Sequence, residues 1–277
     1  MKKFAVIGKP IKHSLSPEIH CEFAKEVGID ITYEAIEVGA EKFDSEVRAL
    51  LEGGYEGLNV TLPLKELAFN FADQVSETGR QTEAVNTLWS QDEKVYADST
   101  DGIGLLRDLE ANSLFVENTN LIILGAGGAA QSIIPSLLEL QPKRLFILNR
   151  TREKSFLLAE KYKASSIEIR CSFSNIRNSL LKESPSAIIN ATSSGTRNEK
   201  LQIPDFNLEI FPASAWAYDL SYSKEVTPFN KLASEFGCPV CIDGLGMLVN
   251  QAAASFEIWT GIRPSVERTL NLIKNKL

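Results

Sequence analysis

The chain has 277 residues, of which 44% are hydrophobic and 23% charged, a composition typical of a globular protein with room for two modest α/β domains or one large one. The formal net charge of −7 disfavours nucleic acid as a partner, because phosphate backbones bind basic surfaces. The first apolar run stops at Gly8, too early for an export signal or a membrane span. We therefore expect a cytoplasmic protein with no membrane partner.

One C-x-x-C pair stands out among the four cysteines, which are Cys21, Cys171, Cys238 and Cys241. A zinc site would need a second pair or nearby histidines, and the two histidines, His13 and His20, lie far away in the sequence. A redox pair is the other alternative. We favour two small residues at a buried strand, with reduced thiols and no bound metal.

Strand and helix patterns alternate along the chain, which predicts an α/β fold with largely parallel sheets. In the first third the expected elements are strand Phe4–Gly8, helix Pro17–Val27, strand Ile31–Val38, helix Glu41–Glu52, strand Gly57–Thr61 and a hairpin of Thr87–Ser90 with Val95–Asp98. In the middle they are helix Gly104–Ala111, strand Leu121–Leu124, helix Ala129–Leu140, strand Arg144–Asn149, helix Thr151–Tyr162 and strands Ile167–Cys171, Ala187–Asn190 and Ala215–Leu220. Toward the end they are helix Thr227–Phe236, strand Cys238–Ile242 and helices Leu245–Thr260 and Pro264–Lys276.

Two domains are expected, with a boundary near Asp101 and Gly102. Residues 1–101 are interpreted as a mostly parallel α/β substrate domain. Residues 102–246 are interpreted as a Rossmann-type nucleotide-binding domain, with the active-site cleft between the two. The helices within 247–277 are expected to return to the first domain.

A glycine-rich turn directly follows the apolar strand Leu121–Leu124. Gly125-Ala126-Gly127-Gly128-Ala129-Ala130 is a G-x-G-x-x-A sequence between a strand and a helix. Gly125 allows the tight turn, Gly127 lets the backbone approach a pyrophosphate, and the small Ala130 lets the helix pack against the sheet. Free N–H groups at a helix N-terminus bind phosphate. The pattern predicts a dinucleotide site, against the alternative of an ordinary glycine turn.

The end of the next strand indicates which dinucleotide binds. About 20 residues after the first glycine, an NAD enzyme places Asp or Glu against the ribose 2′-hydroxyl. Here Asn149 occupies that place and is followed by Arg150, Thr151, Arg152 and Lys154. A guanidinium and a hydroxyl suit a 2′-phosphate, which a carboxylate would repel. NADP is predicted, although Arg152 and Lys154 also fit a solvated helix face.

Polar side chains gather where the strands of the first domain end. Ser14 and Ser16 lie on a loop before a helix, where Ser16 is also a candidate helix cap. A hydroxyl and an amine follow another strand at Thr61 and Lys65, where a turn with a surface lysine is the alternative. Asn86 begins a strand, and Asp101 lies at the domain junction, where it also fits a helix N-cap.

Together these segments closely resemble the shikimate dehydrogenase family over essentially the whole chain. The matching motifs occur in the family's order, at 13–17 (H-S-x-S-P), 59–65 (N-V-T-x-P-x-K), 84–87 (A-V-N-T), 100–102 (T-D-G), 125–129 (G-A-G-G-A), 149–151 (N-R-T), 190–195 (N-A-T-S-x-G), 243–252 and 259–261 (W-T-G). The resemblance implies NADPH-dependent reduction of 3-dehydroshikimate to shikimate in aromatic amino acid biosynthesis. It implies a small-molecule substrate and a monomer or homodimer.

The resemblance also implies roles for individual residues. Lys65 and Asp101 would form the catalytic pair. The substrate carboxylate would contact Ser14, Ser16 and Tyr222, and the ring hydroxyls would contact Thr61, Asn86, Asp101 and Gln251. The pyrophosphate would lie at Gly125, Ala126, Gly127, Gly128 and Ala129, and the 2′-phosphate at Asn149, Arg150, Thr151 and Lys154. The ribose and nicotinamide would be surrounded by Thr192, Ser193, Leu220, Gly244 and Met247, with Glu77 a weaker candidate.

The chain departs from the common family pattern at four positions. Cys21 stands where Asn is common, Leu64 where Phe is frequent, Glu83 where Gly is common and Ser99 where Asn is frequent. None of these departures removes an expected catalytic group. Three alternative functions remain: a quinate-accepting member of the family, a methylene-tetrahydrofolate dehydrogenase, which would not need this set of polar residues, and a non-enzymatic NADP sensor.

Overall fold

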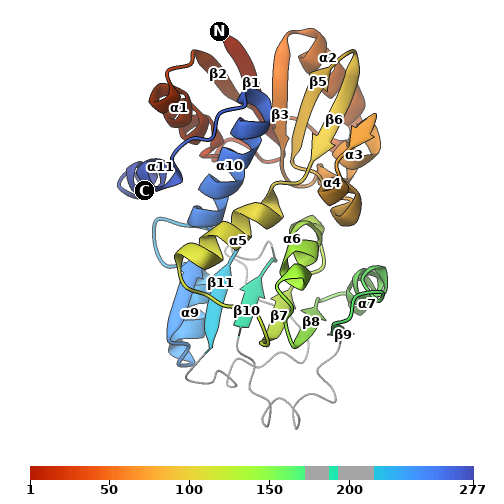
Figure 1. Cartoon of the computed structure of the whole chain (residues 1–277), viewed down its shortest axis with the longest axis vertical. Helices are drawn as coiled ribbons and strands as arrows, with labels where there is room; N and C mark the ends of the chain where they lie inside the picture. The colour runs from red at the N-terminus through yellow and green to blue at the C-terminus, as the bar shows by residue number, and fades with distance from the viewer. Residues whose placement is uncertain (172–186, 193–214) are drawn as a thin grey trace. The chain divides into compact units, whose positions relative to one another are not determined.

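The computed structural model describes residues 1–171, 187–192 and 215–277 and divides into two compact units (Figure 1). Unit 1 comprises Met1–Arg107 and Gly246–Leu277, and unit 2 comprises Asp108–Leu245. The boundary lies inside helix α5 (Asp101–Ala111), a few residues beyond the predicted junction. Each unit has its own sheet and its own hydrophobic core, so the predicted α/β organisation in two domains is confirmed.

The sheet of unit 1 has six strands in the order β2-β1-β3-β5-β6-β4. Their bounds are β1 Lys2–Gly8, β2 Ile31–Glu37, β3 Tyr55–Val60, β4 Gln74–Val75, β5 Thr87–Gln91 and β6 Lys94–Asp98. Strand β1 pairs in parallel with β2 and β3, and β6 pairs in parallel with β4. The predicted hairpin β5–β6 is antiparallel, as is the β3–β5 pair, so the sheet is mixed.

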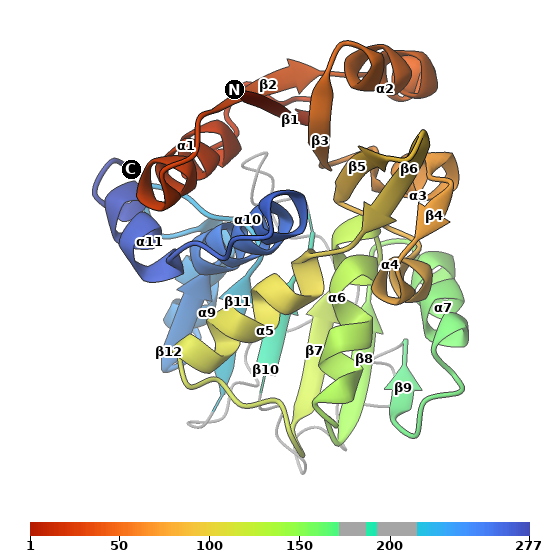
Figure 2. The same ribbon diagram turned by 45° about the horizontal axis from the view of Figure 1, so that its top comes forward.

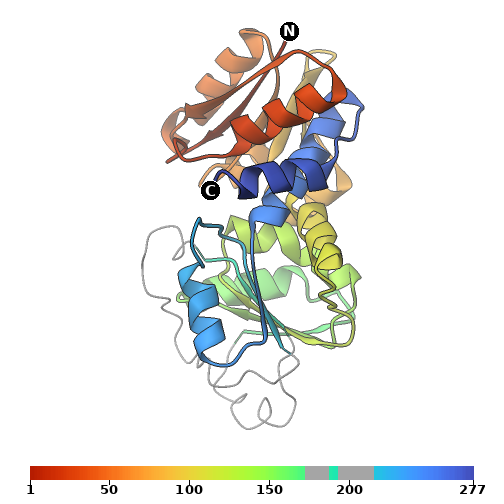
Figure 3. The same cartoon turned by 90° about the vertical axis from the view of Figure 1, so that its left-hand side faces the viewer.

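The helices of unit 1 differ from the prediction mainly where they are short. They are α1 Ser16–Val27, α2 Phe43–Glu52 after a 3₁₀ turn at Ala40–Lys42, α3 Lys65–Phe71, α4 Glu77–Thr82, the start of α5, α10 Leu245–Thr260 and α11 Val266–Lys274, which packs beside α1 (Figure 3). The predicted pattern lacked α3, α4 and β4, because elements of two to seven residues carry too little periodicity to be recognised. Helix α5 also begins earlier than predicted, at Asp101 itself.

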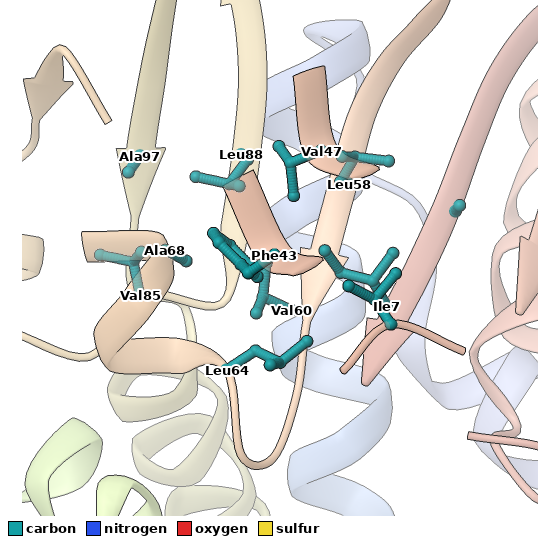
Figure 4. Close-up of a cluster of buried hydrophobic side chains, with 12 residues drawn as sticks. Ile7, Phe43, Val47, Leu58, Val60, Leu64, Ala68, Val85, Leu88 and Ala97 are labelled. Carbon is teal, nitrogen blue, oxygen red and sulfur yellow. The ribbon is translucent and has the colours of Figure 1, made fainter. Parts of the chain in front are cut away.

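Alternation along β1 divides the apolar side chains of unit 1 between two cores. Ala5 and Ile7 face a cluster built with Phe43 of α2 and Leu64. Figure 4 shows Ile7 and Phe43 among apolar side chains that also come from β3, β5 and α3. Phe4 and Val6 face the opposite side, where the Phe4 ring stacks on Trp259 of α10 at 4.8 Å between centroids. The sheet is therefore covered on both faces.

Unit 2 contains a sheet in which every described pairing is parallel (Figure 2). Its strands are β7 Asn120–Leu124, β8 Arg144–Leu148, β9 Glu168–Arg170, β10 Ala187–Asn190, β11 Trp216–Asp219 and β12 Val240–Asp243. The described helices that lie wholly within it are α6 Gly128–Glu139, α7 Arg152–Lys161 and α9 Pro228–Glu235. The order β9-β8-β7-β10-β11-β12 reverses direction between β7 and β10, as in doubly wound dinucleotide-binding domains.

The core of unit 2 explains the C-x-x-C pair. Cys238 is buried in the cluster of Ile122, Phe146 and Phe229 beneath α9, and Cys241 packs against the same cluster from β12. Both thiols are free, and burial raises the pKa of Cys238 to about 12. The pair therefore contributes to packing as two small residues, but the strand is not buried as predicted, because Val240 of β12 is exposed and Cys241 only partly buried. In the described part of the chain, no group of three or more His, Cys, Asp or Glu side chains could hold a metal.

None of the helices in the described residues has the length and apolar character needed to cross a membrane.

His20 lies fully buried in the second core of unit 1. Its ring stacks on Tyr33 at 4.2 Å between centroids and meets the edge of Phe23. Burial lowers the pKa of His20 from 6.5 to about 3, and the neighbouring Asn59 side chain opposes this shift only in part. The folded protein therefore holds a neutral imidazole at neutral pH.

Replacing His20 should reduce the sensitivity of the fold to mild acid. Below pH 6.5 the unfolded chain takes up a proton that the folded chain refuses until about pH 3, so His20 lowers stability as pH falls through this window. Between pH 7 and pH 5, His20 alone should lower the free energy of unfolding by about 2 kcal/mol. In urea unfolding at pH 5, 6 and 7, His20→Phe should flatten that dependence. The control His13→Gln, which replaces the exposed other histidine, should keep the pH dependence of the parent. If the stability of His20→Phe depended on pH as strongly as that of the parent, the acid sensitivity would not come from His20.

Candidate active site

Lys65 and Asp101 form a buried ion pair in unit 1. Lys65 is the first residue of α3 and Asp101 the first of α5, and their side chains are only 11% and 8% exposed. The ammonium Nζ donates to Oδ2 of Asp101. Lys65 is therefore not the surface lysine of the alternative interpretation. Burying such a pair costs desolvation energy that its attraction only roughly repays, so fold stability alone does not account for it.

Asn86 completes the environment of Asp101. Its Nδ2 donates to Oδ1 of Asp101 at 3.1 Å and to Oε1 of Gln251 at 2.9 Å. Asp101 thus accepts a hydrogen bond from Lys65 on Oδ2 and one from Asn86 on Oδ1. Gln251, on α10, is brought beside Asn86 by the return of the C-terminal helices to unit 1. Lys65, Asn86, Asp101 and Gln251, distant in sequence, lie together.

The backbone around Lys65 explains this placement. Val85 N–H donates to the Lys65 carbonyl at 3.2 Å, which joins the start of α3 to the segment before β5. Asn86 N–H donates to the carbonyl of Asp98 at 3.1 Å, and its own carbonyl accepts from Val60 at the end of β3. Three strand ends therefore meet at Asn86, and each carries part of the polar cluster.

The serine loop has a different capping pattern from the one predicted. Helix α1 begins at Ser16 itself, and the position before it, Leu15, makes no capping side-chain bond. Ser14 Oγ instead accepts from Ser16 N–H at 3.3 Å. The Ser16 side chain is buried, whereas Ser14 and Thr61 are half-buried. Ser16 is therefore not a simple helix cap, because its hydroxyl has no capping role in the helix that it begins.

Several buried polar residues beside this cluster had no predicted role. They are Tyr33, Asn59, Thr87, Thr100 and Ser255. Thr100 N–H donates to Asn86 Oδ1 at 2.8 Å, and the Thr87 hydroxyl donates to the same oxygen at 3.1 Å. The Thr100 hydroxyl accepts from Asn86 Nδ2 at 2.9 Å and lies 3.2 Å from Asn86 Oδ1. Three of the five lie inside the N-V-T, A-V-N-T and T-D-G motifs, so their sequence signal was present. Tyr33 and Ser255 carried none, because an isolated Tyr in a strand or Ser in a helix is unremarkable.

Two of the family departures have local physical consequences. Leu64 is fully buried in the unit 1 core, so it keeps the apolar contact of the residue that it replaces. Glu83 ends α4 in the left-handed region at φ 52°, a conformation that glycine adopts more easily. Ser99 is buried and Cys21 packs beside Tyr33, with no effect on Lys65 or Asp101 apparent from either.

The glycine turn of unit 2 follows β7, next to the point where the strand order reverses. Gly125 has φ +110°, and a Cβ there would lie 2.8 Å from the carbonyl oxygen of Ala191. Among the described residues, a Cβ at Gly127 or Gly128 would meet no atom within 4 Å. Gly127 is exposed and, as the residue before α6, supplies no side chain to cap the helix. Ala126 and Ala129 are half-buried beside it, and this cradle fits a pyrophosphate.

The end of β8 presents the residues expected at a 2′-phosphate. Asn149 is half-buried, and its Nδ2 donates to the Thr151 carbonyl at 3.0 Å, which shapes the turn into α7. Arg150, Thr151 and Lys154 are exposed. The described residues provide no carboxylate at the end of β8, and the guanidinium of Arg150 faces solvent. The donor set fits the phosphate of NADP.

The buried side chains of Asn190 and Asp219 make hydrogen bonds at the ends of β10 and β11. Asn190 Nδ2 donates to Asp219 Oδ1 at 3.0 Å, and Asn190 Oδ1 accepts from the Thr192 hydroxyl at 2.7 Å. Asp219 Oδ1 also accepts from Ser221 N–H, and Leu220 N–H donates to the Asn190 carbonyl. Thr192 and Leu220 are therefore held at adjoining strand ends of unit 2.

The remaining predicted residues are distributed between the two units. Gly244 packs against the Leu220 carbonyl, where any Cβ would collide, and half-buried Tyr222 lies on the loop after β11, both in unit 2. Met247 is buried in α10, and Glu77 is exposed at the start of α4, both in unit 1. Ser193 lies outside the described residues.

Comparisons with known proteins cover both units. Three family models match: the shikimate dehydrogenase substrate binding domain at residues 6–88, shikimate / quinate 5-dehydrogenase at 109–203, and the shikimate 5'-dehydrogenase C-terminal domain at 244–274. The shikimate dehydrogenase (NADP(+)) of Chromobacterium violaceum is 40% identical over 99% of this chain and 98% of its own.

Solved structures agree with the sequence matches. The structure of an Ael1 enzyme from Pseudomonas putida matches 98% of both chains with a TM-score of 0.86 and 36% identity. Shikimate 5-dehydrogenase from Thermus thermophilus, in complex with NADP(H) and shikimate, matches 100% of both chains with a TM-score of 0.86 and 30% identity. With this identity over nearly the full length and both domains matched, the chain belongs to the shikimate dehydrogenase family.

Proposed function

We propose that this chain catalyses the reversible NADPH-dependent reduction of 3-dehydroshikimate to shikimate, a step of aromatic amino acid biosynthesis. The observation that carries the proposal is the buried Lys65–Asp101 pair beside the amides of Asn86 and Gln251. Lys65 and Asn86 lie within the segment that matches the substrate binding domain of the family, and Gln251 lies within the segment that matches the C-terminal domain. The relatives' specificity for NADP(+) supports the cofactor assignment.

Ketone reduction needs a hydride at carbon and a proton at oxygen. When bound, NADPH supplies the hydride. The ketone oxygen then becomes alkoxide-like, and we assign Lys65 to stabilise it and to donate the proton. Asp101 orients the ammonium and accepts a hydrogen bond from a neighbouring ring hydroxyl. In the reverse direction, Lys65 takes the proton back from the alcohol.

The other polar residues are assigned to binding. Ser14 and Ser16, with Tyr222, hold the substrate carboxylate, and Thr61, Asn86 and Gln251 hold ring hydroxyls. Gly125–Ala129 hold the pyrophosphate, and Asn149, Arg150, Thr151 and Lys154 hold the 2′-phosphate. Thr192, Ser193, Leu220, Gly244, Met247 and Glu77 are assigned to the ribose and nicotinamide. The cytoplasmic location, the domain bounds 1–101 and 102–246, and the monomeric or dimeric state stay predictions.

A spectrophotometric assay tests the function directly. With shikimate, kcat/KM for NADP⁺ should exceed that for NAD⁺ by more than about 10-fold, because one charged hydrogen bond to the 2′-phosphate contributes about 1.5–3 kcal/mol. Arg150→Ala should reduce the use of NADP⁺ far more than that of NAD⁺. Quinate, which carries an extra ring hydroxyl, should be a much poorer substrate. Comparable rates with quinate would support the broader specificity, and cofactor binding without turnover would support a sensor.

The two turn glycines should separate folding from cofactor binding. Gly125→Ala places a side chain at φ +110° against the Ala191 carbonyl and should lower the free energy of unfolding by about 1–3 kcal/mol. Gly127→Ala has open space around its new methyl group and a β-region backbone, so stability should change by less than about 0.5 kcal/mol. That methyl occupies the space assigned to the pyrophosphate, so NADP⁺ should bind about 10-fold more weakly. Urea unfolding and fluorescence titration measure the two effects, and tight NADP⁺ binding by Gly127→Ala would contradict the site.

Lys65→Met should separate an enzyme from a binding protein. The variant keeps the apolar stem but leaves the Asp101 carboxylate without its cation, so its free energy of unfolding should fall by up to about 3–5 kcal/mol. The cofactor residues of unit 2 are untouched, so it should still bind NADP⁺, and kcat is compared per folded enzyme. Its kcat should fall at least about 100-fold, in the range of a lost acid–base group. Asp101→Asn should also lower kcat, and the double variant should lose less than the product of the two, since the groups act as a unit. A kcat within about threefold of the parent would require another proton donor.

A further inference from the structure

Unit 1 contains a layer of buried polar side chains behind the catalytic pair. Asn59, Thr87, Thr100 and Ser255 are each no more than 5% exposed, and Tyr33 is 6% exposed. We propose that Ser255, Asn59 and Thr87 are positioning residues that hold Asn86, and through it Asp101, in the orientation that the reduction requires. This inference rests on the proposed function.

The orientation of the Asn86 amide determines what Asp101 meets. Its oxygen accepts from Thr100 N–H at 2.8 Å, a backbone donor that cannot rotate away. Its nitrogen therefore faces Asp101 Oδ1 and Gln251 Oε1. A flipped amide would place its oxygen against the carboxylate and leave Thr100 N–H unpaired, which is costly in a buried site.

Ser255 holds the two threonines that flank the Asn86 oxygen. Its Oγ lies 2.7 Å from Thr87 Oγ1 and 3.1 Å from Thr100 Oγ1. A serine hydroxyl has a single proton, which goes either to one of these hydroxyls or to the Gln251 carbonyl at 3.1 Å. Wherever this proton points, Ser255 Oγ stays within hydrogen-bonding distance of both threonine hydroxyls. Because it lies one helical turn after Gln251, α10 brings both residues to Asn86.

Asn59 connects this group to the middle of the sheet. Its Oδ1 accepts from the Tyr33 hydroxyl at 2.7 Å, which decides the direction of its amide. Its Nδ2 consequently donates to Ser255 Oγ and to the Asn86 carbonyl, both at 3.0 Å. Asn59 thus contacts Asn86 directly at the backbone and indirectly through Ser255.

Fold stability does not require this arrangement. A buried hydrogen bond contributes only about 0.5–1.5 kcal/mol net, and replacing both partners with apolar groups of similar shape is close to neutral. A polar layer at this position instead restricts side-chain orientation, because each amide has one satisfied direction. Catalytic groups must be held to within about 0.5 Å, which requires supporting residues of this kind.

Ser255→Ala and the matched pair Thr87→Val and Thr87→Ser test the proposal. In steady-state assays with shikimate and NADP⁺, Ser255→Ala and Thr87→Val should lower kcat by about 3- to 10-fold, the equivalent of one net hydrogen bond. Thr87→Ser keeps the hydroxyl and should restore most of the rate. KM for NADP⁺ should stay within about twofold, because the cofactor residues of unit 2 are untouched. If Ser255→Ala fails to fold, the Thr87 pair carries the test.

Two further comparisons separate positioning from folding. In an Asp101→Asn background, Ser255→Ala should cause little additional loss of kcat, because it acts through Asp101. Tyr96→Phe removes a hydroxyl from the same sheet outside this group and should leave kcat unchanged. Variants that melt earlier but keep the parental kcat per folded enzyme would overturn the inference while leaving the proposed function intact. A parent that does not oxidise shikimate would overturn both.

Discussion

The Lys65 side chain, only 11% exposed, needs a counter-charge, and this requirement organises the polar half of unit 1. Asp101 provides the charge, and Asn86 satisfies the carboxylate oxygen that Lys65 leaves available. The ends of β3, β6 and the segment before β5 must meet for these side chains to converge. Because a buried ion pair adds little net stability, this convergence is best understood as a device for chemistry.

The two faces of the unit 1 sheet serve different purposes. One is a purely apolar core formed with α2 and α3, in which Leu64 anchors the turn that leads into Lys65. The other carries the buried polar layer and the aromatic group of His20, Tyr33 and Trp259 against α10. Helix α10 therefore supplies Trp259 to a core and both Ser255 and Gln251 to the polar layer.

Unit 2 depends on backbone geometry more than on charged side chains. The strand order β9-β8-β7-β10-β11-β12 reverses between β7 and β10, and Gly125 allows the chain to turn after β7 against Ala191. The absence of side chains at Gly127 and Gly128 keeps the N-terminus of α6 accessible. Asn190 and Asp219 then fix the neighbouring loops through one hydrogen bond between buried side chains.

Sequence alone determined what depends on local chemistry. The β7–α6 glycine turn, the missing acidic residue at Asn149 and the strand β1 could be predicted because each depends on residues that are neighbours in the sequence. The short helices α3 and α4 could not, since they have too few residues to show a pattern. The sequence also did not predict that Lys65 is buried, that Ser14 accepts from Ser16 N–H, or that Tyr33 and Ser255 join the polar layer. These depend on contacts between residues far apart in the chain, such as Asn59 with Ser255, and only tertiary structure places such pairs within hydrogen-bonding distance.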